Sequence, residues 1–235
     1  MNVIDYALLG IVGVSLLYGL YKGFVGSLLG LIALFAAMFA AYAIAPSVAA
    51  SILRNESIVD TLIHYTDAAS RVGDLDMAKM AVSGLSSQRI AEVVARVGLP
   101  VPFDALLSGN MAQQVFAAIG SVSVAEYINQ TIVTSMVSIL SYVLTFIVAY
   151  VAMSLLIGLF GFVFKFPALR QLDAILGGVL GLARGVFLVF ILFAVVPVVM
   201  TVLPFDQFGD LVQSSRIGSA LYQSNVITSI LQGHL

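Results

Sequence analysis

The stretch that decides the fold spans residues 3–45 and reads VIDYALLGIVGVSLLYGLYKGFVGSLLGLIALFAAMFAAYAIA. About 20 apolar residues in a helix cross the ~30 Å hydrocarbon core of a bilayer, and this stretch is long enough to cross it twice. Lys22 and Gly23 divide it into two apolar segments, 3–21 and 24–45. We therefore predict two membrane-spanning helices joined by a tight turn. Lys22 would lie at the membrane surface, and Gly23 would supply the backbone freedom that the turn requires.

Two further apolar stretches of this kind follow later in the chain, at 132–162 and 174–203. The sequence thus predicts an all-α integral membrane protein with four transmembrane helices in two hairpins and a small helical extracytoplasmic segment. The predicted parts are a first hairpin in 1–45, an amphipathic segment in 46–130, a second hairpin in 131–203 and a C-terminal amphipathic tail in 204–235.

The composition supports a membrane location. Of the 235 residues, 61% are hydrophobic and 9% are charged, against roughly 25% charged residues in an average soluble domain. The lipid bilayer is therefore the first partner that we expect. A net charge of −2 gives no basic excess for neutralising phosphates, so no nucleic acid partner is expected. The absence of cysteine excludes thiol catalysis, disulfides and zinc thiolate sites.

Basic residues in the short loops set the predicted orientation, because loops rich in Lys and Arg tend to remain in the cytoplasm. Lys22, Lys165 and Arg170 fall on one side of the predicted bundle. The other side holds Asp5, the tail and the 46–130 segment, in which acidic residues outnumber basic ones. Both termini are therefore predicted to be extracytoplasmic.

The 46–130 segment is predicted to form short amphipathic helices. Helical spacing of small and apolar residues occurs twice, in Met77, Met80, Ala81 and Gly84, and in Ile90, Val93, Val94 and Val97. Three pairs resemble capping boxes, namely Ser57 with Asp60, Asn110 with Gln113, and Ser123 with Glu126. The last pair predicts that the third apolar helix begins near Val124. These helices either pack as a cap on the spans or lie flat on the bilayer. In the tail, one or two interfacial helices are predicted from Ile217, Leu221, Ile227 and Leu231.

The fourth apolar stretch carries an unusual set of small and charged residues, namely Asp173, Gly177, Gly178, Gly181, Arg184 and Gly185. The spacing of four between Gly177, Gly181 and Gly185 leaves one helix face as bare backbone, against which a neighbouring helix can pack closely. Further along the same stretch, Pro197 removes a backbone hydrogen bond and predicts a kink.

Arg184 is the residue of greatest functional interest. It follows Asp173 by eleven residues, which is about 16 Å along a helix and near half the depth of the hydrocarbon core. A charge at that depth normally faces a protein interior or an aqueous cavity and has a partner. Alternatively, the long side chain reaches back to the inner membrane surface. The sequence leaves both alternatives open.

The remaining spans give weaker indications. Gly26 and Gly30 form a GxxxG pair, continued by small residues, which predicts a face that receives another helix; the continuing residues are Ala33, Ala37 and Ala41. The hydroxyl groups of the third span either bond their own helix carbonyls or line a polar path; they belong to Ser141, Thr145 and Ser154. Asp5 either pairs with a base across the bundle or lies in the outer membrane interface.

The two predicted hairpins share a pattern of acidic, basic and glycine residues. The spacing of Asp5, Gly10 and Gly13 recurs in Asp173, Gly178 and Gly181, and Lys22-Gly23 matches Arg184-Gly185. This pattern is compatible either with an inverted repeat of the kind that builds transporters or with chance similarity between glycine-rich helices.

No motif indicates an enzyme, a cofactor or a metal. The chain has no HExxH and no Walker lysine, and its two histidines, His64 and His234, lie outside the predicted spans. A serine protease would require a GxSxG-like nucleophile with a histidine, and an intramembrane aspartyl protease would require two aspartates within spans. We therefore expect no enzymatic activity.

The chain resembles the colicin V production protein (CvpA) family of bacterial inner-membrane proteins. The resemblance is carried by Ile4-Asp5-Tyr6 through Lys22-Gly23-Phe24 and by Asp173 through Gly177-Gly178, Gly181 and Arg184-Gly185. It covers both predicted hairpins and leaves out the 46–130 segment. The resemblance implies a multi-pass inner-membrane protein linked to colicin V production or export, without assigned catalytic residues.

Two functions are compatible with these observations. The first is a non-enzymatic component that supports export of a toxin peptide or permeation of a small solute, with Arg184 and the glycine-rich fourth span as the working element. The second is a scaffold that binds another envelope protein. Besides lipid, the partners to expect are a second copy of this chain or an envelope protein.

Overall fold

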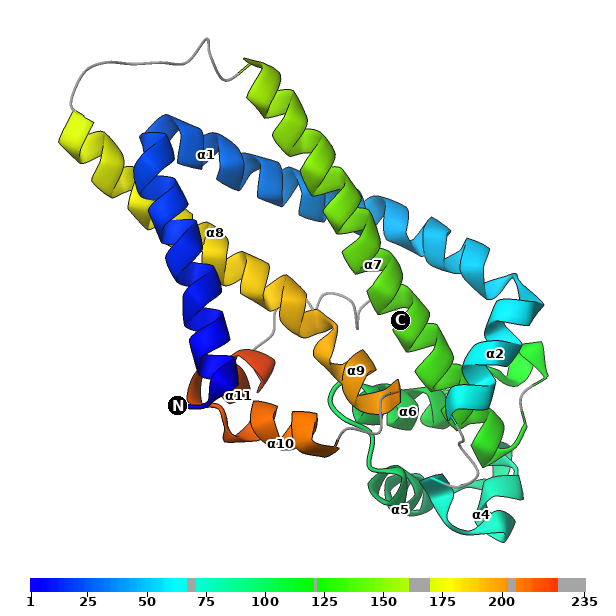
Figure 1. The fold of residues 1–235 in the computed structure, drawn as a ribbon. Helices are drawn as coiled ribbons and strands as arrows, with labels where there is room; N and C mark the ends of the chain where they lie inside the picture. The colour runs from blue at the N-terminus through cyan, green and yellow to red at the C-terminus, as the bar shows by residue number, and fades with distance from the viewer. Residues whose placement is uncertain (67–70, 121, 161–169, 203–205, 224–235) are drawn as a thin grey trace. The chain divides into compact units, whose positions relative to one another are not determined.

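The computed structural model describes residues 1–66, 71–120, 122–160, 170–202 and 206–223, and its regular elements are helices (Figure 1). In chain order they are α1 (Val3–Leu53), α2 (Glu56–Thr66), α4 (Leu75–Lys79), η1 (Val82–Gly84), α5 (Ser87–Val97), α6 (Phe103–Ala112), η2 (Ala117–Ile119), α7 (Val124–Phe160), α8 (Arg170–Ala194), α9 (Val196–Val202), α10 (Asp206–Ser214) and α11 (Arg216–Gln223). The predicted all-α class is confirmed.

Three helical stretches in the described part of the chain are long and apolar enough to cross a membrane: Val3–Leu53, Val124–Leu159 and Leu172–Thr201. The first stretch is α1, which has non-helical backbone angles at Gly23. Figure 1 shows the blue helix changing direction there. Many large apolar side chains on these helices are exposed, which is typical of a surface that faces lipid rather than water.

The chain divides into two compact units. The first consists of Met1–Pro46, Ser141–Val195 and Asp206–Ile227, and the second of Ser47–Leu140, Val196–Phe205 and Thr228–Leu235. Helices α1 and α7 each contribute one part to each unit.

The second unit has a hydrophobic core of its own, which includes the fully buried side chains of Phe103, Leu107 and Tyr127. The amphipathic helix predicted around Ile90 is confirmed as α5, since Ile90, Val93 and Val97 are buried. Helix α5 packs against α6, and both belong to the second compact unit.

The capping predictions had mixed outcomes. Ser123 and Glu126 form the predicted capping box, and α7 begins at Val124 as predicted. The Ser57–Asp60 box is wrong, because Asn55 is the residue whose side chain accepts from the first turn of α2. The Asn110–Gln113 box is also wrong.

Asn110 lies near the end of α6 instead of its start, and its amide donates to Thr131 on α7. The helix expected from Met77 to Gly84 ends early, because Met80 has extended backbone angles. In both places the residue spacing fits a helix, but the position of the helix end depends on contacts with other elements.

The two prolines of the long apolar helices behave differently. Pro46 does not end the second apolar segment, since α1 continues through it to Leu53. In the fourth stretch, where Pro197 predicts a kink, the helix is interrupted at Val195, between α8 and α9. Pro197 lies in the first turn of α9, where its missing N–H has no intrahelical partner to lose.

The tail forms two short helices, α10 and α11, the second of which packs against α8 within the first unit. Four residues used in the predictions lie outside the described residues: Lys165, Ile227, Leu231 and His234. The side chains of Arg170 and Asp206 are likewise not described.

Candidate functional site

The bend in α1 is fixed by Gly23 and by a carboxylate from α8. Gly23 has φ 73° and ψ −176°, a backbone region that is open essentially only to glycine. Asp173 Oδ1 accepts a 2.9 Å hydrogen bond from the Phe24 amide and so caps the helical arm that begins after the bend. A side chain on Gly23 would also overlap the Asp173 carboxylate. The chain therefore bends where Lys22-Gly23 predicted a turn, and the cap comes from a different helix.

The glycine face of α8 packs against the first arm of α1, residues 3–22. A methyl group on Gly181 would overlap the Ser15 carbonyl oxygen and lie 2.9 Å from the Gly19 Cα. A methyl group on Gly185 would lie 2.9 Å from the Ser15 Cβ. Gly177 likewise faces the backbone of Gly19 and Gly23. The two helices approach this closely because the α8 face has no side chains at the crossing, and α1 presents only Gly19, Gly23 and the small Ser15 there.

Gly178 differs from the other three glycines of α8. The atoms nearest to a methyl group at this position belong to the Leu20 side chain. A flexible leucine can move aside, whereas the backbone at Gly177 and Gly181 cannot. The tight crossing therefore depends on the three glycines spaced by four residues, and Gly178 lies beside the crossing without being part of it.

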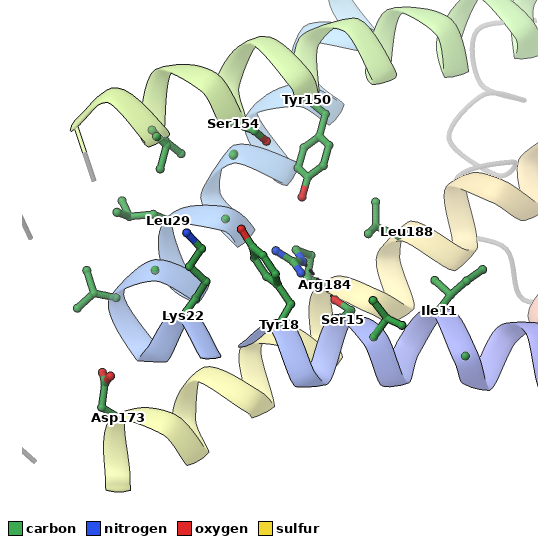
Figure 2. A pocket seen from close by; sticks show the side chains of 18 of the residues that line it. Ile11, Ser15, Tyr18, Lys22, Leu29, Tyr150, Ser154, Asp173, Arg184 and Leu188 are labelled. Carbon is green, nitrogen blue, oxygen red and sulfur yellow. Dashed lines mark hydrogen bonds between the residues drawn. The ribbon is translucent and has the colours of Figure 1, made fainter. Parts of the chain in front are cut away.

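A pocket of about 1170 Å³ lies within the first unit, beside this crossing. Both arms of α1 line it, together with α8 and the part of α7 from Tyr150 to Gly158 (Figure 2). Its polar lining residues are Ser15, Tyr18, Lys22, Tyr150, Ser154, Asp173 and Arg184. Apolar residues line most of the remaining wall.

Arg184 projects from α8 into this pocket (Figure 2). Its Nε donates a 3.2 Å hydrogen bond to Ser15 Oγ, and Ser15 Oγ donates a 2.6 Å bond to the Gly181 carbonyl. The guanidinium carbon lies 4.7 Å from the centre of the Tyr18 ring, which is cation–π geometry. The side chain is thus held by a hydroxyl and an aromatic ring of the first arm of α1.

Lys22 is the second cation of the pocket, and its Nζ lies 5.6 Å from the centre of the same Tyr18 ring. Figure 2 shows Tyr18 between Lys22 and Arg184. The ion pairs formed by the described residues involve Asp5 and Glu92 as acids. Within that part of the chain, neither pocket cation therefore has a carboxylate at ion-pair distance.

The GxxxG pair of the second arm lines the pocket and does not receive another helix. The nearest atom to a methyl group on Gly30 is Arg184 Nη1, at 3.3 Å, and on Gly26 it is the Cβ of the neighbouring Lys22. These glycines leave room for the two cations. Among the described residues, no other helix backbone therefore packs against Gly26 or Gly30, whereas Ala33, Ala37 and Ala41, which continue the predicted face, are buried.

Asp5 lies outside the pocket, and among the described residues it has no base from another span as its partner. Its carboxylate is fully buried and accepts from Ser215 Oγ at 2.6 Å and from the Ile217 amide at 2.9 Å. It also accepts from the Asn2 amide at 2.8 Å. The acid therefore joins the start of α1 to the start of α11, an arrangement that neither sequence alternative for Asp5 included.

The proposed repeat agrees with the structure at its acids and not at its glycines. Asp5 and Asp173 each cap a helix other than their own. However, nothing lies within 4 Å of a methyl group placed on Gly10 or Gly13, whereas Gly181 is tightly packed.

Sequence reasoning missed three of the polar pocket residues: Ser15, Tyr18 and Tyr150. The signal for the first two was a polar stripe, because Ser15, Tyr18 and Lys22 are spaced by three and four residues on one helix face. Of the hydroxyl groups considered on α7, Ser154 lines the pocket. Ser141 is buried, and within the described structure its Oγ has no hydrogen-bond partner.

Comparison with known proteins places the chain in a family. The family model described as "Colicin V production protein" matches residues 4–97 and 106–225, which also covers most of the 46–130 segment that the sequence resemblance left out. No curated protein and no solved structure matches the chain. Because the family model covers most of the chain, including every residue of the pocket, the chain belongs to the colicin V production protein family.

Proposed function

We propose that this protein is a non-enzymatic, multi-pass protein of the bacterial inner membrane that lets a small solute or a toxin peptide enter or pass through the pocket of the first unit. The observation that carries the proposal is Arg184, a cation that projects into a large, mostly apolar pocket without an acid as its ion-pair partner among the described residues. Structural arginines in membranes are normally neutralised by an acid or by carbonyl groups. Colicin V production, which the family description names, is the process in which we expect this activity to operate.

The bend at Gly23 supports four membrane spans. Residues 3–22 and 24–53 of α1 are each long enough to cross the bilayer at 1.5 Å per residue, and α7 and α8 supply the other two. In this arrangement the bend and Lys22 lie at the cytoplasmic side, because short basic loops remain there. Both termini and the second unit then lie outside the cytoplasm.

The environment of Arg184 is sufficient to hold a cation at membrane depth. Insertion of an arginine near the bilayer centre costs about 2.5–3.5 kcal/mol on experimental scales. A desolvated cation–π contact contributes about 2 kcal/mol, and a hydrogen bond from a charged donor about 1.5–3 kcal/mol. Tyr18 and Ser15 together therefore lower the cost of holding Arg184 there.

The test uses cells in which this chain is the only member of its family, and it measures secreted colicin V by growth inhibition of a sensitive strain. Arg184→Ala is expected to abolish the inhibition zone while the protein remains at the wild-type level in the membrane. Arg96→Ala, which removes an arginine from α5 outside the pocket, is the matched control and should secrete normally.

Variants that fill the pocket separate this proposal from the scaffold alternative. Gly26→Leu and Ser154→Leu each add a large side chain to the pocket wall. At Gly26 the added side chain does not clash with the backbone of another helix. Passage through the pocket predicts loss of secretion in both. A scaffold predicts normal secretion, because the outer surface is unchanged. Normal secretion by both filling variants and by Arg184→Ala would refute the proposal.

A further inference from the structure

We infer that the pocket binds a phosphate group attached to an apolar body, with Lys22 and Arg184 as its charge partners. This inference rests on the proposed function, because it assigns the ligand class of the same pocket. The two possible sources of such a ligand are a phospholipid of the surrounding membrane and a water-soluble phosphate ester.

The charge of the pocket favours an anion. Its lining holds two cations, Lys22 and Arg184, and one acid, Asp173. The acid already accepts the Phe24 amide, so part of its hydrogen-bonding capacity serves the helix cap. Two cations that share one aromatic ring repel each other. A bound anion that both cations contact at the pocket surface reduces that repulsion.

The geometry of Arg184 leaves its planar fork available. The Nε–H donates to Ser15, and within the described structure no protein group accepts from Nη1 or Nη2. Guanidinium groups bind phosphate and carboxylate oxygens through two parallel N–H bonds. Gly30 has no side chain where Nη1 approaches it, so the guanidinium fits against the second arm of α1 while it lines the pocket.

The choice of phosphate over carboxylate follows from the two separate cations. Lys22 and Arg184 lie on either side of Tyr18 (Figure 2). A carboxylate offers two oxygens in one plane and is satisfied by the arginine alone. A phosphate group offers additional oxygens in a tetrahedral arrangement, which a second, differently placed cation such as Lys22 can contact.

The rest of the lining fits an apolar body. Side chains of Ile11, Val14, Leu29 and Leu188 line the pocket together with the cations. Ligand pockets commonly have volumes of roughly 300–1,000 Å³, and this one is about 1170 Å³. An inorganic ion would leave most of that volume empty, whereas an alkyl phosphate or a lipid would use it.

The experiment measures binding to the purified full chain in dodecyl maltoside by isothermal titration calorimetry. Hexyl phosphate is the probe, and hexanol and hexyltrimethylammonium are controls with the same apolar body. Saturable binding of hexyl phosphate and no binding of either control are expected. Arg184→Gln and Lys22→Gln should each weaken hexyl phosphate at least about tenfold, whereas Arg96→Gln and Lys79→Gln should bind as the wild type does.

Two further arms identify the source of the ligand. In the first of these arms, dioctanoyl phosphatidylglycerol competes with hexyl phosphate for the pocket. If this lipid displaces hexyl phosphate at a concentration below that of hexyl phosphate, the ligand is a lipid headgroup. Failure of this lipid to compete, while hexyl phosphate still binds, assigns it to a soluble phosphate ester. Inorganic phosphate tests the contribution of the apolar body and should bind more weakly than hexyl phosphate.

The inference is overturned if the wild type shows no saturable binding of hexyl phosphate, or if hexyltrimethylammonium binds equally well. It is also overturned if Lys22→Gln and Arg184→Gln both bind as the wild type does. Lys22 is exposed, so Lys22→Gln keeps the test valid even where Arg184→Gln does not fold. Loss of secretion in the filling variants without phosphate binding would leave the proposed function standing. Phosphate binding by the wild type, together with normal secretion in the filling variants, would support the anion site and refute the proposed function.

Discussion

At the scale of single residues, Gly181 decides how closely α8 approaches the first arm of α1. A methyl group there would overlap the Ser15 carbonyl oxygen and approach the Gly19 Cα, both of which belong to the helix backbone and cannot rotate away. We expect Gly181→Ala to destabilise the protein by about 1–3 kcal/mol, as overpacking of a tight contact does. The measurement is the thermal unfolding midpoint in detergent, followed by circular dichroism.

Gly13→Ala is the matched control for that substitution. Gly13 lies on α1, and nothing lies within 4 Å of its methyl position. Alanine in place of a helical glycine normally stabilises by about 0.5–1 kcal/mol, so the midpoint should rise or stay unchanged. An equal fall in both variants would show that the loss comes from glycine content and not from the crossing.

Residue patterns predicted some of these contacts and missed others for a physical reason. The spacing of Gly177, Gly181 and Gly185 indicates that a helix packs there, because only a bare face permits close approach. It does not identify the partner helix, since Gly19 and Ser15 lie more than 150 positions earlier in the chain. The GxxxG pair at Gly26 and Gly30 has the same spacing and instead makes room for side chains.

At the scale of elements, the start of α1 is bonded to the two tail helices. The Asn2 side-chain amide donates to the Leu211 carbonyl, and Asp5 accepts from Ser215 and Ile217. We expect Asp5→Ala to speed amide hydrogen exchange in α11 by about tenfold or more, because buried donors lose a charged acceptor. Hydrogen exchange of the purified protein, read by mass spectrometry, measures this.

Asp210→Ala is the control for the tail, because Asp210 is an exposed acid on α10. Exchange in α11 should match the wild type in this variant. Ser215→Ala should speed exchange as Asp5→Ala does, and the double variant should add little, since both remove the same bond. Unchanged exchange in α11 on loss of Asp5 would refute the link between the two ends.

Element boundaries were predictable where a local signal decides them. The Ser123–Glu126 box marks the start of α7 because both hydrogen bonds lie within four residues. The continuation of α1 through Pro46 was not predictable in this way. Residues beyond Pro46, such as Ala49, pack in a buried cluster with Val133 and Val137 of α7, and such tertiary packing outweighs the loss of one backbone hydrogen bond.

At the scale of the whole molecule, the apolar helices were predictable from the sequence, but the assignment of α9 to the second unit was not. Helix α9 belongs to it together with α2. Arg71 contributes to this grouping by donating to the Thr66 and Thr201 carbonyls. Hydropathy assigns Thr201 to a membrane span because it reads each residue by its neighbours in sequence. An average over neighbouring residues contains no information about hydrogen bonds between segments that are distant in the sequence.

The proposed membrane arrangement predicts opposite labelling at two exposed positions. Gln88 lies on the surface of α5 in the second unit, and Tyr21 is 84% exposed beside the bend of α1. Because the chain has no cysteine, single cysteines at these positions are the only thiols. With a membrane-impermeant maleimide, Gln88→Cys should react in intact spheroplasts and Tyr21→Cys only after lysis. The reverse pattern would invert the orientation. Labelling of both from outside would mean that the first arm of α1 does not cross the membrane, and the pocket would then lose one of its membrane-spanning walls.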